Sequence, residues 1–132
     1  MCGIGGYYQT GNTNNAPKWA KPALRKMWDN LQSRGSDASG IAYESPTGIR
    51  HYKTDKPAYE LSGLSMSLAF GMNRTPRWVM FHTRASTHGK PEENRNNHPL
   101  MGGKIALCHN GVVYNKDNVL SKFNATAKRG VD

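Results

Sequence analysis

The chain has 132 residues, two cysteines and a formal net charge of +9. This length suits one domain with a modest core, and two cysteines make no disulfide framework, so we expect a reducing, cytoplasmic location. The first residues are polar and Gly-rich, unlike a secretory signal, and no apolar run is long enough to span a bilayer.

The basic residues are scattered along the chain, without a run of five or more like charges or a known nucleic-acid motif. Nucleic-acid binding is therefore not expected. The charge also fits a basic face for an acidic partner or substrate, or a surface with no role beyond solubility.

The N-terminal half predicts a short strand, a helix and a hairpin. Residues 4–8 have the pattern of a strand. An amphipathic helix follows, with apolar residues at helical spacing (Leu24, Met27, Trp28 and Leu31) and with Gly35 just past its end. Residues 40–44 and 49–53 predict two strands joined by a turn, and residues 61–70 predict a short helix that Gly71 ends.

The C-terminal half predicts two more strands and a last helix. Residues 78–82 read as a buried strand, 91–99 as a long polar loop and 105–109 as another strand, in which Cys108 packs as a small hydrophobe. Asn115 is placed to cap a helix through Phe123, with Val119, Leu120 and Phe123 on one face. Short hairpins among the helices favour an α+β fold over a doubly wound parallel sheet.

Cys2 is the most informative residue of the chain. Removal of Met1 would leave a cysteine with a free α-amino group, and so a nucleophile and a base in one residue. Thiolate is the reactive form of cysteine, and an α-amine with a pKa of about 7.7–8.0 can take the thiol proton. On its own, a cysteine at this position would more often be an accident of a frayed terminus.

Further polar clusters lie at the ends of the predicted strands and helices, where catalytic groups gather on a rigid scaffold. They are Arg34-Gly35-Ser36-Asp37, the run from His82 to Gly89, Asn97-His98-Pro99 and His109-Asn110-Gly111. An arginine such as Arg84 can hold a carboxylate with two hydrogen bonds. The Asn110 side-chain amide and the Gly111 backbone N–H can form an oxyanion hole.

Each cluster also has a plainer interpretation. Arg84 alone would more often be structural, and Asn-Gly is a common tight turn. The histidines (His82, His88, His98 and His109) form no helical i, i+4 pair and have no carboxylate at ligand spacing, so we expect no metal site. The glycines at residues 3–6 lack the Lys-Ser/Thr and the helix of a phosphate-binding loop.

Taken together, these clusters resemble the class II glutamine amidotransferase domain of the N-terminal-nucleophile hydrolases. The matching segments are Cys2-Gly3-Ile4, Arg34-Gly35-x-Asp37-x-x-Gly40, His82-Thr83-Arg84-x-x-Thr87-x-Gly89, Asn97-His98-Pro99 and His109-Asn110-Gly111, with Asn115 downstream. Each segment alone is a weak signal, whereas all of them in this order are highly specific. A bulky residue commonly follows His-Thr-Arg in the family, and Ala85 stands there in this chain.

The resemblance implies a catalytic cysteine, Cys2, whose α-amine is the general base, and an oxyanion hole made by Asn110 and Gly111. It implies that Arg84 binds the glutamine α-carboxylate, helped by the Thr87-His88 backbone. Two further residues are implied: Arg34, which helps to fix the nucleophile turn, and Asp132, which stands where family members hold the substrate α-amino group. No cofactor is expected.

The resemblance also implies a four-layer α-β-β-α sandwich that is incomplete at its C-terminus. We expect a single domain over residues 1–132, truncated after Asp132, because the family domain typically runs further. The implied reaction is hydrolysis of the amide of L-glutamine through a Cys2 thioester, with ammonia passing to a synthase domain or subunit. The alternatives are a non-catalytic glutamine-binding or partner-binding subunit and an amidase with a different amide substrate.

Overall fold

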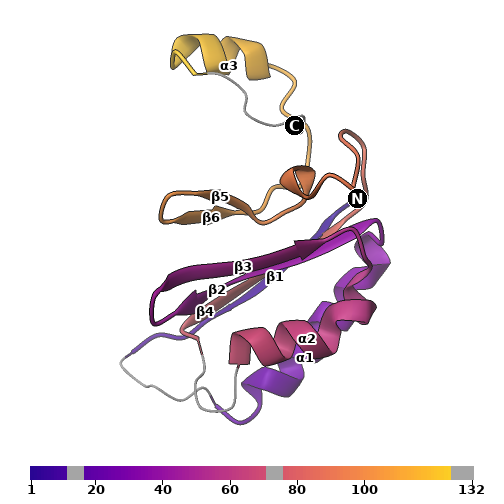
Figure 1. Cartoon of the computed structure of the whole chain (residues 1–132), viewed down its shortest axis with the longest axis vertical. Helices are drawn as coiled ribbons and strands as arrows, with labels where there is room; N and C mark the ends of the chain where they lie inside the picture. The colour runs from indigo at the N-terminus through magenta and orange to yellow at the C-terminus, as the bar shows by residue number, and fades with distance from the viewer. Residues whose placement is uncertain (12–16, 71–75, 126–132) are drawn as a thin grey trace.

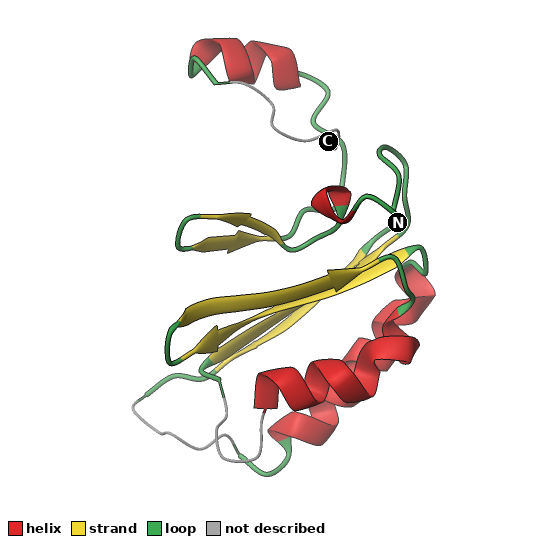
Figure 2. Cartoon of the chain, viewed as in Figure 1, coloured by secondary structure: helices red, strands yellow, loops and turns green. Residues whose placement is uncertain are grey.

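The structure is a computed structural model, and it describes residues 1–11, 17–70 and 76–125. Figure 2 shows a mixed α/β arrangement of helices and antiparallel strands. The strands are β1 (Gly3–Tyr8), β2 (Ala38–Ser45), β3 (Gly48–Thr54), β4 (Trp78–Arg84), β5 (Leu100–Gly102) and β6 (Ile105–Leu107). The helices are α1 (Ala20–Leu31), α2 (Ala58–Phe70) and α3 (Lys116–Lys122), with 3-10 turns η1 (Gln32–Arg34) and η2 (Asn94–Asn96).

Two antiparallel sheets form the centre of the structure. The larger has the strand order β1-β4-β2-β3, and the smaller is the β5-β6 hairpin. Figure 1 shows α1 and α2 on one face of the larger sheet and the β5-β6 hairpin over the other face, with α3 beyond the hairpin. The α+β prediction is confirmed at this level.

The amphipathic helix predicted near the N-terminus is confirmed as α1. Leu24 and Trp28 are buried against the sheet, and Met27 and Leu31 pack partly against the same core. The Trp28 Nε1–H donates a hydrogen bond to the Ala58 carbonyl at 2.6 Å. The Trp28 ring also meets the Phe81 ring edge-on, with 4.8 Å between their centroids. One indole therefore joins α1, the start of α2 and β4.

The two faces of β4 serve different purposes because side chains alternate along a strand. Phe81 and Thr83 point toward the helices, and the Thr83 hydroxyl donates to the Leu31 carbonyl at 2.8 Å. His82 and Arg84 belong to the opposite face, and both are buried. The predicted hairpin of β2 and β3 is confirmed, with Ser45 opposite Gly48 at its turn.

The predicted polar loop at residues 91–99 is buried more deeply than a polar composition suggests. Asn97 is fully buried and His98 is 7% exposed, because this segment crosses the face of the sheet opposite the helices. It lies so close to Gly40 that a Cβ there would collide with the His98 carbonyl oxygen. The Lys53 Nζ donates to the Asn97 carbonyl at 2.8 Å and ties the segment to β3.

The C-terminal predictions need correction. The expected strand at 105–109 ends at Leu107 and pairs with β5, which the sequence pattern did not indicate. The last predicted helix forms, and its apolar residues are largely exposed, since Val119 is 41% and Phe123 72% exposed. Asn115 is the N-cap residue without a side-chain cap bond. The helix lies away from the main core (Figure 1), so nothing among the described residues buries it.

The predicted helix at 61–70 is confirmed as α2, which begins three residues earlier, and Gly71 lies outside the described residues. In the described part of the chain, every helix is too short or too polar to cross a bilayer.

Candidate active site

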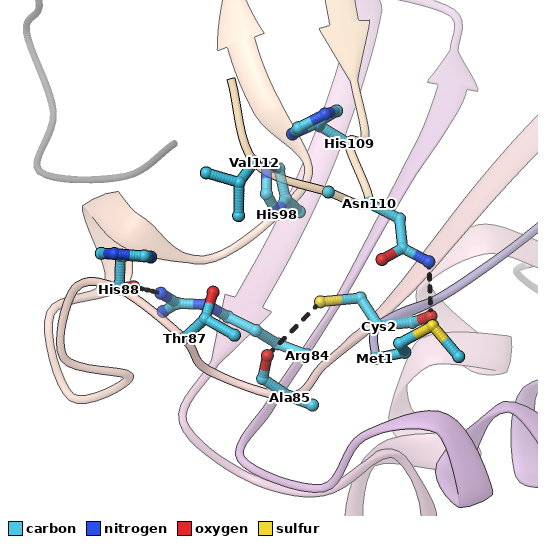
Figure 3. Close-up of a pocket in the computed structure, with 11 residues that line it drawn as sticks. Met1, Cys2, Arg84, Ala85, Thr87, His88, His98, His109, Asn110 and Val112 are labelled. Atoms are coloured by element: carbon cyan, nitrogen blue, oxygen red, sulfur yellow. Dashed lines mark hydrogen bonds between the residues drawn. The ribbon is translucent and has the colours of Figure 1, made fainter. Parts of the chain in front are cut away.

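The strand register of the larger sheet places Cys2 beside the end of β4. Gly3 of β1 pairs with Thr83, so Cys2 stands just outside the ladder and next to Arg84. The Cys2 thiol is half-buried and donates a weak hydrogen bond to the Ala85 carbonyl, with 3.6 Å between sulfur and oxygen. Figure 3 shows the sulfur pointing into the pocket.

Asn110 reaches Cys2 across almost the whole length of the chain. Its Nδ2 donates to the Cys2 carbonyl at 2.9 Å. A side-chain amide carries two N–H donors, so one of them can serve the Cys2 carbonyl while the other serves a substrate oxygen. Gly111 follows with φ of +141°, a backbone conformation that side-chain-bearing residues rarely adopt. The glycine is therefore required for the turn that brings this segment to Cys2.

The Arg84 guanidinium is at the centre of a buried hydrogen-bond network, and Arg84 is only 4% exposed. Its Nη1 donates to Asn97 Oδ1 at 2.8 Å, and its Nη2 donates to the carbonyls of His88 and Gly89, the latter at 3.0 Å. The guanidinium therefore holds residues 85–89 around itself while it also lines the pocket. The sequence left both a structural role and contact with a substrate open for Arg84, and the structure shows the structural role.

Asp37 anchors the other side of this loop. Its carboxylate accepts a hydrogen bond from the Ser86 N–H at 2.7 Å, and its own N–H donates to the Arg84 carbonyl at 3.0 Å. The Arg-Gly-x-Asp cluster thus contributes an anchor for the loop that follows β4, a contact that its position in the sequence did not reveal.

Two histidines are packed together beneath the pocket. The rings of His82 and His98 lie 4.4 Å apart between centroids, and both residues are buried. Burial lowers the pKa of His82 to about 4 and that of His98 to about 3, with a further lowering from the nearby Arg84 charge. Both rings are therefore neutral near pH 7. The His82 Nε2–H points to the His109 carbonyl at 3.3 Å.

These groups meet in one pocket of about 230 Å³ (Figure 3), which has room for a molecule the size of an amino acid. None of the described residues that line it is acidic. Since Arg84 is a permanent cation, the pocket suits a ligand with a carboxylate. Its lining residues are Met1, Cys2, Arg84, Ala85, Thr87, His88, His98, His109, Asn110, Gly111 and Val112.

The structure thus brings together most of the site residues expected from the sequence, namely Cys2, Arg84, Thr87, His88, Asn110 and Gly111. Arg34 is exposed at the outer rim, where its Nη2 lies 3.8 Å from the Met1 sulfur. Asp132 lies outside the described residues. The chemical roles expected for all of these residues stay predictions.

Sequence reasoning gave no role to Asn97, His98 or His82, although their motifs were noticed. The signal available in the sequence was the pair Asn97-His98, which stands directly before a proline inside an otherwise polar loop.

The second cysteine is a poor alternative nucleophile, because burial raises the pKa of the Cys108 thiol to about 12. Among the described residues, no group of three or more histidines, cysteines and acids is arranged to hold a metal ion.

Comparison with known proteins gives a consistent set of relatives. The chain is 36% identical over 116 residues to a glutamine–fructose-6-phosphate aminotransferase (isomerizing) of Listeria monocytogenes, a match that covers 87% of the chain and 17% of that protein. Proteins of the same name from Thermus thermophilus and Corynebacterium efficiens are 36% and 31% identical, over 98% and 95% of the chain. The chain spans about a fifth of the length of these relatives. No protein-family model matches it.

Proposed function

Because the chain belongs to the class II glutamine amidotransferase domains of the N-terminal-nucleophile hydrolases, we propose that it hydrolyses the side-chain amide of L-glutamine. The observation that carries this proposal is the shared pocket of Cys2, Arg84, Asn110 and Gly111. It offers a nucleophile, a cation for the substrate carboxylate and two N–H donors for an oxyanion within the space of one amino acid.

The first step is formation of a thioester on Cys2. Once Met1 is removed, the α-amine takes the thiol proton and the sulfur attacks the amide carbon. The oxygen of the tetrahedral intermediate is stabilised by the Asn110 amide and the Gly111 N–H. The amine then returns the proton to the leaving nitrogen, so the C–N bond breaks and ammonia departs.

The second step is hydrolysis of the thioester. The α-amine, again unprotonated, takes a proton from a water molecule that attacks the thioester carbon. Collapse of the second tetrahedral intermediate breaks the C–S bond, and glutamate leaves as the sulfur regains a proton. Arg84, with the Thr87-His88 segment, holds the α-carboxylate throughout, which keeps the amide aligned with the sulfur.

We propose that the ammonia is used outside these 132 residues, by a sugar-phosphate-binding domain or subunit. The names of the relatives support this acceptor class, and those relatives are about five times as long as the chain. The order of layers in Figure 1, with α1 and α2, then the larger sheet, then β5-β6 and then α3, supports a four-layer α-β-β-α sandwich.

The deciding experiment is a glutaminase assay on the whole protein with its N-terminus at Cys2. We expect stoichiometric glutamate and ammonia from L-glutamine, and trapping of Cys2 by a glutamine-like electrophile such as a diazoketone. Glutamine binding without turnover would favour the non-catalytic alternative, and turnover of another amide in preference to glutamine would favour the amidase alternative.

A further inference from the structure

A single peptide unit connects the Asp37 carboxylate to the Cys2 thiol. The Ser86 N–H donates a hydrogen bond to Asp37 Oδ2 at 2.7 Å. The Ala85 carbonyl accepts the hydrogen bond of the Cys2 thiol at 3.6 Å. The Ala85 carbonyl and the Ser86 N–H belong to the same planar peptide bond. A carboxylate that holds the N–H therefore also fixes the direction of the carbonyl on the other side of that bond.

The main chain around Asp37 brings the two segments into contact. Asp37 stands directly before β2, and its N–H donates to the Arg84 carbonyl at 3.0 Å, at the end of the ladder between β2 and β4. Gly35 lies so close to the loop after β4 that a Cβ there would collide with the Arg84 carbonyl and the Ala85 nitrogen. These main-chain contacts do not involve the Asp37 side chain, so they remain when its carboxylate is removed.

The orientation of the Cys2 thiol depends on this carbonyl. A cysteine side chain has three staggered rotamers, and among the described residues the Ala85 carbonyl is the hydrogen-bond partner of the thiol. Figure 3 shows the sulfur pointing into the pocket while it makes this contact. Attack on a bound amide needs the sulfur about 3–3.5 Å from the carbon, and a displacement of about 1 Å can lower the rate about 100-fold.

We propose, resting on the proposed function, that Asp37 is a positioning residue for the nucleophile: through the Ala85–Ser86 peptide it holds the Cys2 sulfur in the orientation from which it attacks glutamine. Asp37 is outside the residues that line the pocket, so it acts through this peptide and not on the substrate. The ionised acceptor on the N–H also strengthens the carbonyl as an acceptor, because hydrogen bonds in series polarise one another.

The test measures the attack of Cys2 on two electrophiles, in the whole protein with its N-terminus at Cys2. A diazoketone analogue of glutamine is bound in one orientation, whereas iodoacetamide is small and meets the sulfur from many directions. Asp37→Ala removes the carboxylate. We expect kcat for glutamine and the maximal rate of inactivation by the diazoketone to fall about 10-fold. We expect KM for glutamine and the rate of Cys2 alkylation by iodoacetamide to change by less than about threefold.

Asp37→Asn is the conservative variant, because its side-chain oxygen can still accept from the Ser86 N–H without the charge. We expect it to bring the inactivation rate back to within about threefold of wild type. Inactivation as slow as in Asp37→Ala would overturn the proposal. Asp29→Ala is the matched control with wild-type rates, since Asp29 is exposed on α1 and outside the residues that line the pocket.

The two electrophiles separate orientation from other effects. Equal slowing of both in Asp37→Ala would assign the effect to the reactivity of the thiol and overturn the proposal, and so would a raised KM with an unchanged kcat. If circular dichroism shows that Asp37→Ala does not fold, Asp37→Leu, which has a similar shape and no acceptor, takes its place with the same outcomes.

The wild-type protein distinguishes this inference from the proposed function. Wild-type protein that neither hydrolyses glutamine nor reacts with the diazoketone would overturn the proposed function itself. Wild-type turnover together with unchanged rates in Asp37→Ala would overturn only the positioning role of Asp37.

Discussion

Single residues of the pocket combine a structural role with the recognition role proposed for them. Arg84 shows this most directly, since the guanidinium that faces the pocket also binds Asn97 and the carbonyls of His88 and Gly89. Substitutions here will change folding and substrate binding together, so each experiment needs a measurement of both.

Cys2→Ala is expected to abolish ammonia release from glutamine while the protein stays folded. Among the described residues the Cys2 thiol makes a single weak hydrogen bond, to the Ala85 carbonyl, so its removal costs little stability, whereas covalent catalysis is lost outright. The measurements are ammonia release and the thermal unfolding midpoint. Cys108→Ala is the control, and turnover near the wild-type rate in Cys2→Ala would place the chemistry elsewhere.

Arg84→Lys is expected to raise KM for glutamine and also to lower the free energy of unfolding by about 1–3 kcal/mol. Lysine keeps the charge but cannot reach three acceptors and a carboxylate with one planar group. Steady-state kinetics and urea denaturation of the same preparation separate the two effects. An unchanged KM would refute the assignment of the carboxylate to Arg84, whatever happens to stability.

The buried histidine pair predicts loss of stability in mild acid. The folded-state pKa of His82 is about 4 and that of His98 about 3, both below the ordinary value of 6.5. At a pH between the folded-state and the ordinary pKa values, the unfolded chain binds more protons than the folded protein does. The free energy of unfolding therefore falls as the pH drops below about 6.5, by up to about 1.4 kcal/mol per pH unit for each ring. Urea denaturation from about pH 7.5 to 5 measures this pH dependence of the free energy of unfolding. We expect a smaller slope in the double variant His82→Gln/His98→Gln. An equal slope in both proteins would contradict the burial argument.

At the scale of elements, the sequence predicted the helices and turns that depend on residues close together in the chain. The spacing of Leu24 and Trp28 predicted α1, and the turn residues between β2 and β3 predicted the hairpin. The burial of Asn97 and His98 escaped prediction because it depends on Gly40, more than fifty residues earlier, which lets the segment lie against the sheet. The sequence left the exposure of the apolar side of α3 open, because an apolar stripe does not say whether a partner is present.

The contact at Gly40 gives an element-level prediction. A methyl group in Gly40→Ala would meet the backbone of His98, which cannot move without disturbing the Arg84–Asn97 bond. We expect a loss of about 1–3 kcal/mol in the free energy of unfolding together with weaker glutamine binding. Gly102→Ala is the control, since nothing lies within 4 Å of a Cβ built there. Equal behaviour of the two variants would show that the 96–99 segment adapts freely.

At the scale of the whole molecule, the site is assembled from segments far apart in the sequence. Met1 and Cys2, the loop after β4, the buried 96–99 segment and the turn after β6 all line one pocket. The α+β architecture could be anticipated, but the way in which these segments meet depends on sheet register and on the crossing of β4 between β1 and β2.

The chain that retains Met1 is expected to be inactive. Met1 lines the pocket, and while it is attached the Cys2 nitrogen is an amide that cannot take the thiol proton. Intact-mass spectrometry combined with a glutaminase assay checks this expectation, with material that begins at Cys2 as the reference. Full activity in a preparation that uniformly keeps Met1 would rule out the N-terminal-nucleophile mechanism.

The hydrogen bond from Asn110 to Cys2 also sets an order of events during synthesis. Its two residues are 108 positions apart, so at a translation rate of about 5–20 residues per second the proposed nucleophile is synthesised roughly 5 to 20 seconds before the residue proposed to complete its oxyanion hole. During that interval the terminus is open to an aminopeptidase, and Cys2 is not yet next to the other groups of its proposed site. Maturation and activation are thereby separated in time by the length of the chain alone.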